Sequence, residues 1–355
     1  MSNFTAAILG LTHPHAQLHL RSLQECERVS RVVLWDPDAA PAKTFAGDND
    51  RKIAGSYTDL AALLEKERPL FAFATMRNDL NAEVCVQALR AGVHVLSEKP
   101  IAVSAAEVQR VVEAAERSGC KLGVVYQNRW LPIVQEARRL VREGVLGRLT
   151  SCEARVVTSQ VRYRDPKHWL FDRDKSGGGI LSWLGCHSLD CLRYVTGDEV
   201  ASVSAITATL GGAPNNVEDV ASVSMQFRSG AIGSLQAGYQ LPISQSGYTG
   251  AAYDSYLAFR GTEGVMHWRS SEKPLVLHVQ SVHPGFNAAP ARQIQYEPAN
   301  SPAYGGVAGV QFLGTFIDAA LGQGDCPASG NDALRVARIV EAAYESNRTG
   351  RRVDL

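Results

Sequence analysis

The sequence predicts an α/β protein with two domains: a doubly wound parallel sheet in residues 1–125 and a second domain with an antiparallel sheet in residues 126–355. Three observations predict this arrangement. The chain has 355 residues, enough for two separate hydrophobic cores. Roughly the first 120 residues alternate apolar runs with helical stretches, as βαβ units do. After about residue 150, apolar and polar residues alternate instead, which indicates strands with one buried face.

Apolar runs and helical patterns define the expected elements of the first domain. A helix over residues 81–91 places Val84 and Ala88 on one face and ends at Gly92, a residue type that commonly caps helices. Another helix is expected over residues 104–118. The predicted strands are residues 6–10 (AAILG), 31–36 (RVVLWD), 70–75 (LFAFAT) and 93–100 (VHVLSEKP).

The second domain has its clearest strand signal in residues 221–228 (ASVSMQFR). Ala221, Val223, Met225 and Phe227 alternate there with polar residues, so one face is buried and the other is wet. Further strands are expected at residues 202–210, 231–239, 255–261 and 275–282. A final helix is expected at residues 331–350, and this helix could pack back on the first domain.

Composition excludes several classes of partner. The 36 basic and 36 acidic residues give a formal net charge of +0, so nothing indicates nucleic acid or an anionic membrane as a partner. No apolar run is long enough to cross a bilayer, and the N-terminus lacks the basic start of a signal peptide. The seven cysteines are scattered without a CxxC pair. These features predict a reduced, cytoplasmic protein.

Residues 8–16 (ILGLTHPHA) stand where a dinucleotide-binding turn would lie. In such a turn, the first glycine makes the bend, the second lets the backbone approach a pyrophosphate, and the third lets helix pack on strand. Those offsets hold Gly10, Thr12 and His15 here. Pro14 suits the first turn of a helix, and the Thr12 hydroxyl can donate to a phosphate oxygen. Either a modified nucleotide site or an ordinary strand–helix turn fits this segment.

Asp36 favours the nucleotide interpretation. It ends the second predicted strand, at a separation from Gly10 that suits an acidic residue binding the ribose hydroxyls of adenosine. A carboxylate there repels a 2′-phosphate, so NAD is expected rather than NADP. The alternative is an ordinary turn residue before Pro37.

Glu98-Lys99-Pro100 leaves the fourth predicted strand, and this tripeptide resembles a motif of the Gfo/Idh/MocA family (glucose–fructose oxidoreductase and inositol dehydrogenase). "SEKP" also occurs at residues 271–274, where it precedes a strand of the antiparallel region. Only Lys99 stands at the carboxyl edge of a parallel sheet, where open α/β folds bind ligands.

Further segments resemble the same family in order and spacing. Residues 123–149 resemble its link between domains, with Asn128 and Arg129 facing the site. Residues 176–197 (SGGGILSWLGCHSLDCLRYVTG) resemble its glycine-rich segment and following helix, with His187 matching the catalytic histidine. The closing residues 338–355 are also similar.

The resemblance implies an N-terminal Rossmann domain and a C-terminal α/β domain whose large open, mainly antiparallel sheet forms a homo-oligomer, a dimer or tetramer. It implies an NAD-dependent oxidoreductase that acts on a sugar, glycoside or cyclic polyol. Lys99 would move the hydroxyl proton, because a partly desolvated amine beside a cationic nicotinamide can accept it, and His187 would assist.

The chain departs from the family's pattern at several positions. Besides the replaced glycines, Trp183 stands where the family has an aspartate four residues before His187. This change removes a carboxylate that would orient the imidazole and is expected to put aromatic surface in the site. Asn81 stands where a histidine is common, and Met76 replaces the proline after Thr75.

Turn, motif and resemblance together define two expected sets of ligand contacts, without a metal site. The cofactor set is Gly10, Leu11, Thr12, His13, Pro14, His15, Asp36, Thr75, Arg77, Asn78, Glu98, Lys99 and Asn128. The substrate set is Lys99, Arg129, Tyr163, Arg164, His168, Trp169, Trp183 and His187.

Other interpretations stay open from the sequence. Lys99 could be a solvated charge at a strand end, and His187 a satisfied core histidine. The protein could instead be an NAD-dependent glycosidase that works by transient oxidation, elimination and re-reduction, as some relatives are. It could also be a non-enzymatic ligand sensor. Cys186, His187, Asp190 and Cys191 are poorly spaced for zinc, so the cysteines are expected to pack within the helix.

Overall fold

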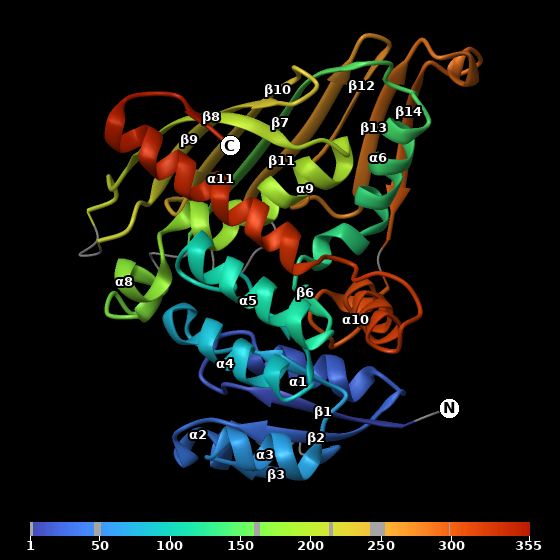
Figure 1. Ribbon diagram of the computed structural model, residues 1–355. Helices are drawn as coiled ribbons and strands as arrows, with labels where there is room; N and C mark the ends of the chain where they lie inside the picture. The colour runs from blue at the N-terminus through green and yellow to red at the C-terminus, as the bar shows by residue number, and fades with distance from the viewer. Residues whose placement is uncertain (1–2, 46–50, 160–163, 213–215, 242–252, 298) are drawn as a thin grey trace. The chain divides into compact units, whose positions relative to one another are not determined.

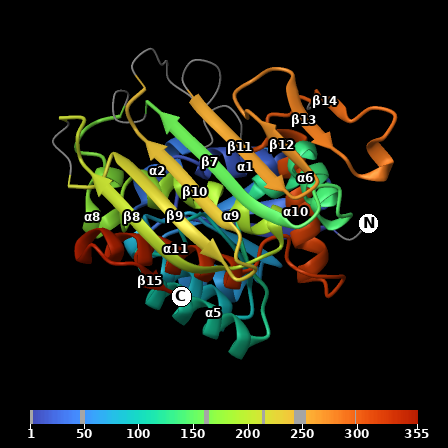
Figure 2. The same ribbon diagram turned by 90° about the horizontal axis from the view of Figure 1, so that it is seen from above.

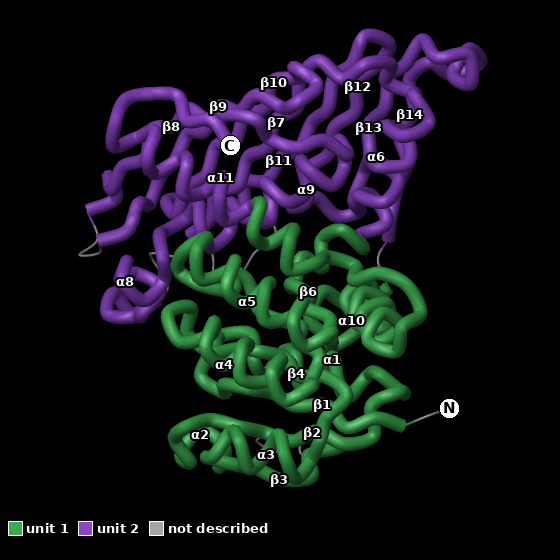
Figure 3. Tube along the Cα trace, in the orientation of Figure 1, with its two compact units in different colours: residues 1–130, 298–335 green, residues 131–297, 336–355 purple. Residues whose placement is uncertain are grey.

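The computed structural model describes residues 3–45, 51–159, 164–212, 216–241, 253–297 and 299–355. The chain forms two compact units, coloured green and purple in Figure 3. The first unit combines Met1–Trp130 with Pro298–Arg335, and the second combines Leu131–Glu297 with Val336–Leu355. Among the described residues, no helix is both long and apolar enough to span a membrane.

The first unit contains a parallel sheet with the strand order β3-β2-β1-β4-β5-β6. Figure 1 labels β1, β2, β3 and β6 of this sheet. This order is that of a Rossmann fold, and it confirms the predicted doubly wound sheet. The six described strands are β1 Phe4–Leu9, β2 Val29–Trp35, β3 Ile53–Tyr57, β4 Phe71–Ala74, β5 His94–Ser97 and β6 Leu122–Val124.

Strand β3 was not predicted because it lacks an apolar run. It is the edge strand of this sheet and has no fully buried residue, whereas all four residues of β4 are buried. A central parallel strand is covered on both faces and therefore reads as continuously apolar, but an edge strand can stay partly wet.

The helices of the first unit follow the strands in alternation. α5 is a clear case. The Ser104 side chain caps its start by accepting the N–H of Glu107, and Gly119 ends it in the left-handed region. The buried face of the helix includes Val108, Val111 and Val112. α4 and α5 lie side by side (Figure 1). The helices are α1 Ala16–Glu25, α2 Ala39–Phe45, α3 Leu60–Glu67, α4 Asn78–Arg90, α5 Ala105–Ser118, η1 Gln127–Trp130 and α10 Gly306–Ala320.

The two units differ from the expected domains in residues 126–130 and 298–335, which belong to the first unit. Within the second of these segments, α10 buries Phe316, whose ring centre lies 5.8 Å from that of Phe71 in β4. The pattern of a helix shows which face is apolar but not which domain that face covers, so the sequence did not place this helix.

The second unit contains a mainly antiparallel sheet with the order β14-β13-β12-β11-β7-β10-β9-β8-β15 (Figure 2). Among the described strands, β7 and β10 pair in parallel and the other neighbours are antiparallel. The strands are β7 Leu149–Thr158, β8 Val200–Ala208, β9 Val220–Phe227, β10 Ile232–Gly238, β11 Tyr253–Gly261, β12 Gly264–Trp268, β13 Leu275–Ser281, β14 Ala291–Tyr296 and β15 Val353–Asp354.

The alternation in β9 behaves as predicted, with Ala221, Val223, Met225 and Phe227 buried. Helices α6 and α9 pack against this sheet, α6 on β13 and α9 on β7 and β10. The unit also contains η2 Trp169–Phe171, α8 Arg173–Ser176, the π-helical turn η3 Leu181–Gly185, η5 Pro284–Phe286 and most of α11; its longer helices are α6 Pro132–Arg142, α9 Cys186–Thr196 and α11 Gly330–Thr349.

Candidate active site

The turn after β1 keeps its first glycine because the neighbouring strand end leaves no room for a side chain. Gly10 has φ +100°, and a Cβ on it would lie 2.7 Å from the carbonyl oxygen of Thr75 and 2.6 Å from the sulfur of Met76. The Thr75 hydroxyl donates to the carbonyl of Gly10. Glycine is thus required here by the approach of β4, before any ligand is considered.

Asp36 lies at the carboxyl end of β2 and reaches the same turn. Its carboxylate accepts the backbone N–H of Leu11 at 2.8 Å and that of Asp38 at 3.1 Å. The side chain is 5 % exposed. Each carboxylate oxygen can accept further hydrogen bonds, so Asp36 can both shape the turn and bind ribose hydroxyls. The ribose interpretation and the turn interpretation are therefore compatible.

His15, at the third fingerprint position, faces the strand β5 side of the unit. Its Nδ1 lies 3.0 Å from Oε1 of Glu98, and the same oxygen lies 2.6 Å from Nε2 of His19. All three side chains are buried. His13 is buried beside them, and its Nδ1 accepts the backbone N–H of His15.

Aromatic rings enclose this histidine cluster. The His19 ring stacks on Phe73 with centres 4.2 Å apart, and Tyr304 lies 4.7 Å from the His15 ring. Sequence reasoning missed His19 and Tyr304. A signal for His19 was present, because residues four apart on a helix share a face, so His15 and His19 project together.

Burial and the contacts with Glu98 act in opposite directions on the pKa values of His13 and His15. Burial lowers the pKa of His13 and of His15 below the ordinary histidine value, although the charge of Glu98 opposes it in both cases. Burial alone would raise the pKa of Glu98, but its proximity to His15 and the hydrogen bonds from His15 and His19 outweigh this effect. The pKa of Glu98 therefore lies well below its usual range.

Lys99 follows Glu98 at the carboxyl edge of β5 and is fully buried. Its backbone N–H donates to Oε2 of Glu98 at 3.1 Å. The alternative of a solvated strand-end charge is therefore wrong for this residue. Gly10, Asp36, Thr75 and Lys99 all follow parallel strands, so they meet at one edge of the sheet.

The loop after β4 is held by Asn81. Its side chain accepts the N–H of Met76 and donates to the Ser97 hydroxyl and to the carbonyl of Ile101. It therefore ties the end of β4 to the end of β5. Arg77, expected at the cofactor, is paired with Asp79 at 2.6 Å, and Asn78 is buried at the start of α4.

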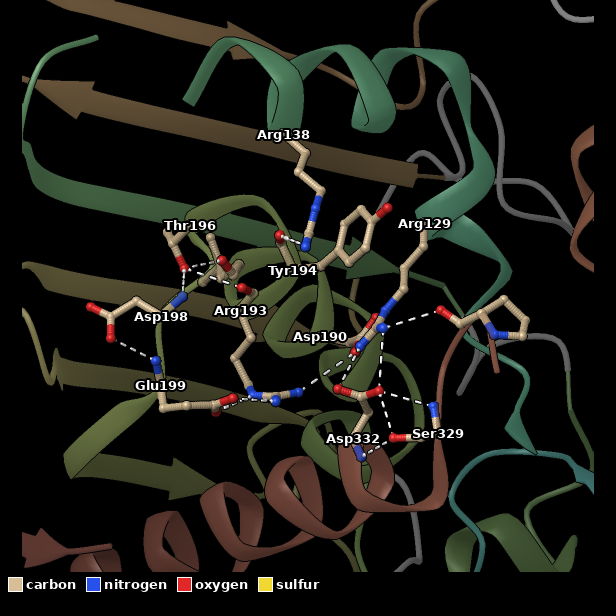
Figure 4. A network of polar contacts seen from close by, with 12 residues as sticks. Arg129, Arg138, Asp190, Arg193, Tyr194, Thr196, Asp198, Glu199, Ser329 and Asp332 are labelled. Atoms are coloured by element: carbon tan, nitrogen blue, oxygen red, sulfur yellow. Dashed lines mark hydrogen bonds and ion pairs between the residues drawn. The ribbon is translucent and has the colours of Figure 1, made fainter. Parts of the chain in front are cut away.

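Arg129, expected at the substrate, is 6 % exposed and pairs with Asp332 at 3.0 Å (Figure 4). It also donates to the carbonyl of Pro327. Both partners belong to the same unit as Arg129. This pairing assigns Arg129 a clear structural task, and Asn128 beside it is half-buried in η1.

In the second unit, the glycine-rich segment is shaped by Glu218. This buried carboxylate accepts the N–H groups of Gly179 and Leu181, at 2.8 and 3.0 Å, and the hydroxyl of Tyr344 at 2.9 Å. A Cβ on Gly178 would lie 2.0 Å from the Tyr344 oxygen. The glycines are therefore required by close packing around Glu218.

His187 stands in the first turn of α9, directly after the π-helical turn η3, and is half-buried. Single π-helical turns often occur at functional sites. Asp190, on the same helix, is buried and lies 3.8 Å from Arg193, which also binds Glu199 (Figure 4). Cys186 and Cys191 are buried in the helix packing, as expected.

Trp183, expected to put aromatic surface in the site, is 2 % exposed. Its ring meets Trp169 edge to face at 6.0 Å, and His168 stacks on Trp169 at 5.5 Å. Trp169 and His168 are half-buried, as is Arg164, whereas Tyr163 lies outside the described residues.

Comparison with known proteins decides the family. Residues 4–126 match a family model described as an oxidoreductase family with an NAD-binding Rossmann fold. Residues 134–267 match the Gfo/Idh/MocA C-terminal domain. The chain belongs to the Gfo/Idh/MocA family. Membership confirms the fold expected from the resemblance and makes the first unit an NAD-binding domain.

Curated relatives of this Gfo/Idh/MocA protein include sugar enzymes. It is 26% identical to 1,5-anhydro-D-fructose reductase of Ensifer adhaerens over 326 residues, which cover 91% of this chain and 90% of the relative. It is 27% identical to D-apiose dehydrogenase of Paraburkholderia graminis over 357 residues, covering 100% and 90%. The structure of levoglucosan dehydrogenase with NADH and levoglucosan aligns over 99% of both chains, with a TM-score of 0.86 and 22% identity.

The residues of this Gfo/Idh/MocA chain fit NAD. The turn at Gly10 precedes the N-terminus of α1, where backbone N–H groups favour phosphate, and Thr12 in that turn is exposed. Asp36 supplies the carboxylate expected beside the adenosine ribose. His15 departs from the glycine fingerprint, and its imidazole is hydrogen-bonded to Glu98.

Proposed function

We propose that this protein is an NAD-dependent oxidoreductase that transfers a hydride between nicotinamide and a carbinol carbon of a sugar, glycoside or cyclic polyol. The observation that carries the proposal is the buried Lys99, held by Glu98 at the sheet edge that also bears Gly10 and Asp36. The sugar enzymes among its relatives support the substrate class.

In this mechanism, NAD supplies the hydride acceptor or donor. Asp36 would bind the adenosine ribose and disfavour a 2′-phosphate, and the turn from Leu11 to His15 would bind the pyrophosphate. The Lys99 amine takes the hydroxyl proton as the alcohol is oxidised and returns it in the reverse direction. His187 assists as a proton carrier or hydrogen-bond partner. His168 and Trp169 contact the sugar.

The test is Lys99→Met, which removes the amine while keeping an unbranched side chain. Wild type and variant are assayed by NADH absorbance with levoglucosan, 1,5-anhydro-D-fructose, D-apiose and myo-inositol. We expect the variant to lose turnover while its Kd for NAD, measured by calorimetry, stays within about threefold. Unchanged turnover would remove Lys99 from the reaction.

A second candidate is an NAD-dependent glycosidase, favoured by Trp183 in place of the family's aspartate. It would release the aglycone of a p-nitrophenyl glycoside with NAD in catalytic amount and without net NADH. Tight sugar binding without turnover in either assay would instead identify a ligand sensor. The homo-oligomer and the cytoplasmic location stay predictions.

A further inference from the structure

One carboxylate oxygen in the first unit is shared by two histidines. Oε1 of Glu98 lies 3.0 Å from Nδ1 of His15 and 2.6 Å from Nε2 of His19. Oε2 accepts the backbone N–H of Lys99. The cluster therefore joins the nucleotide turn and the following helix α1 to the end of β5, which lies 83 residues from His15 and 79 from His19 in the sequence.

The hydrogen-bond roles follow from the carboxylate. An ionised carboxylate only accepts hydrogen bonds, so the His15 and His19 nitrogens that face it carry the protons. His13 accepts the His15 N–H at Nδ1, so its own ring proton is on Nε2. His13, His15 and Glu98 approach within 4.8 Å, close enough for one cation.

We propose that His15 and His19 are positioning residues, which keep Glu98 ionised and thereby fix the backbone of Lys99 relative to the nucleotide turn. This inference rests on the proposed function, because it concerns the same lysine. His15 stands where a fingerprint would have glycine, so the donor to Glu98 replaces the small residue that lets helix and strand pack directly.

Protonation of Glu98 would break this arrangement. A neutral carboxyl carries an O–H donor and is a weaker acceptor, so its hydrogen bonds to the three N–H groups would weaken. The titratable side chains around Glu98 include His13, His15, His19 and Lys99. The side chains of His15 and His19 both donate to the carboxylate.

Paired variants separate donation from packing. His19→Leu and His15→Leu remove the donor and keep a side chain of similar bulk. His19→Gln and His15→Asn keep an N–H at nearly the same reach. The first readout is the protonated-carboxyl band in infrared spectra of the whole protein as pH is lowered, assigned with Glu98→Gln. This readout needs no substrate, so it is independent of whether the proposed reaction is right.

We expect Glu98 to stay ionised in wild type, His19→Gln and His15→Asn, and to take up its proton at higher pH in both Leu variants. With NAD and the panel sugar that gives turnover, kcat should fall roughly tenfold or more in both Leu variants, and in His19→Leu, which lies outside the nucleotide turn, the Kd for NAD should change little. The acid limb of their pH profile should move to higher pH.

The proposal is overturned if the carboxyl band is unchanged in the Leu variants, or if the Gln and Asn variants shift it equally. If the Leu variants do not fold, Glu98→Gln decides, because it keeps the shape and removes the charge. We expect it to bind NAD and lose turnover. Wild-type kcat in Glu98→Gln would overturn the proposal. If the carboxyl band shifts in the Leu variants as expected but wild type shows no turnover with NAD, only the proposed function is overturned.

Discussion

A Cβ on Gly179 would lie 1.9 Å from the carbonyl oxygen of Glu218, so these two residues touch through their backbones. The side-chain carboxylate of Glu218 also accepts the Gly179 N–H at 2.8 Å. This double contact holds the glycine-rich segment just before the turn that leads into α9 and His187. Two predictions concern Glu218 and its hydroxyl partner.

Tyr344→Phe should destabilise the protein, because it removes a hydrogen bond to a buried carboxylate and leaves the ring in place. We expect the free energy of unfolding to fall by about 1–3 kcal/mol, measured by urea denaturation. Tyr194→Phe is the matched control, since its hydroxyl accepts from Gln135 at the surface and should matter by less than about 0.5 kcal/mol. Equal losses would contradict this prediction.

Glu218 should also make stability depend on pH. Burial raises its pKa above the ordinary value of 4.5, and the hydrogen bonds only partly oppose this. The folded state therefore binds the proton more tightly than the unfolded state. This contribution is fully present below the unfolded pKa and is lost as pH rises through the folded pKa. As pH rises above about 4.5, the free energy of unfolding of wild type should fall relative to that of Glu218→Gln. A difference in unfolding free energy that does not change with pH would contradict the raised pKa.

Gly10→Ala should cost more than Gly92→Ala. Both glycines have positive φ, +100° and +80°, but a Cβ on Gly92 would meet nothing within 4 Å. Backbone strain alone costs about 1–2 kcal/mol at Gly92, and the clash with Thr75 and Met76 should bring the loss at Gly10 to roughly 3 kcal/mol or more. Thermal and urea unfolding measure both. A similar loss of unfolding free energy in the two variants would show that the turn at Gly10 can shift to accommodate a Cβ at little cost.

Asp36→Asn should change the cofactor preference without removing the acceptor for the Leu11 N–H. Loss of the negative charge removes repulsion of a 2′-phosphate. We therefore expect the affinity for NADP relative to NAD to rise about tenfold or more, measured by calorimetry. Asp38→Asn, an acidic residue two positions later, is the control and should leave the ratio unchanged. An unchanged ratio of NADP to NAD affinity in Asp36→Asn would mean that this carboxylate stabilises the turn but does not select the cofactor.

Arg129→Lys should destabilise the first unit, because lysine cannot reproduce the paired contacts of the guanidinium with Asp332 and Pro327. The expected loss is about 2–4 kcal/mol for this buried pair. Arg77→Lys, at an ion pair that is about a third exposed, should cost less than about 1 kcal/mol. If Arg129→Lys instead keeps full stability and raises only the KM for the sugar, Arg129 is a substrate contact.

Local patterns predicted most of the fold. The buried run in β4, the alternation in β9 and the capped helix α5 are all encoded within a few neighbouring residues. The carboxyl ends of parallel strands share one edge, so the sequence could also place Gly10, Asp36 and Lys99 together. His187 could be assigned only by resemblance, since nothing in its own neighbourhood distinguishes a catalytic histidine from a packed one.

By itself, the sequence determined the two kinds of sheet, the positions of the turns and the candidate lysine, because apolar periodicity and residue type act over short distances. Tertiary structure alone decided which side chains satisfy the buried charges. Glu98 meets histidines 83 and 79 residues away, and Arg129 meets Asp332 at a separation of 203 residues. A buried charge must find a partner wherever the chain folds back beside it, and no local pattern records where that is.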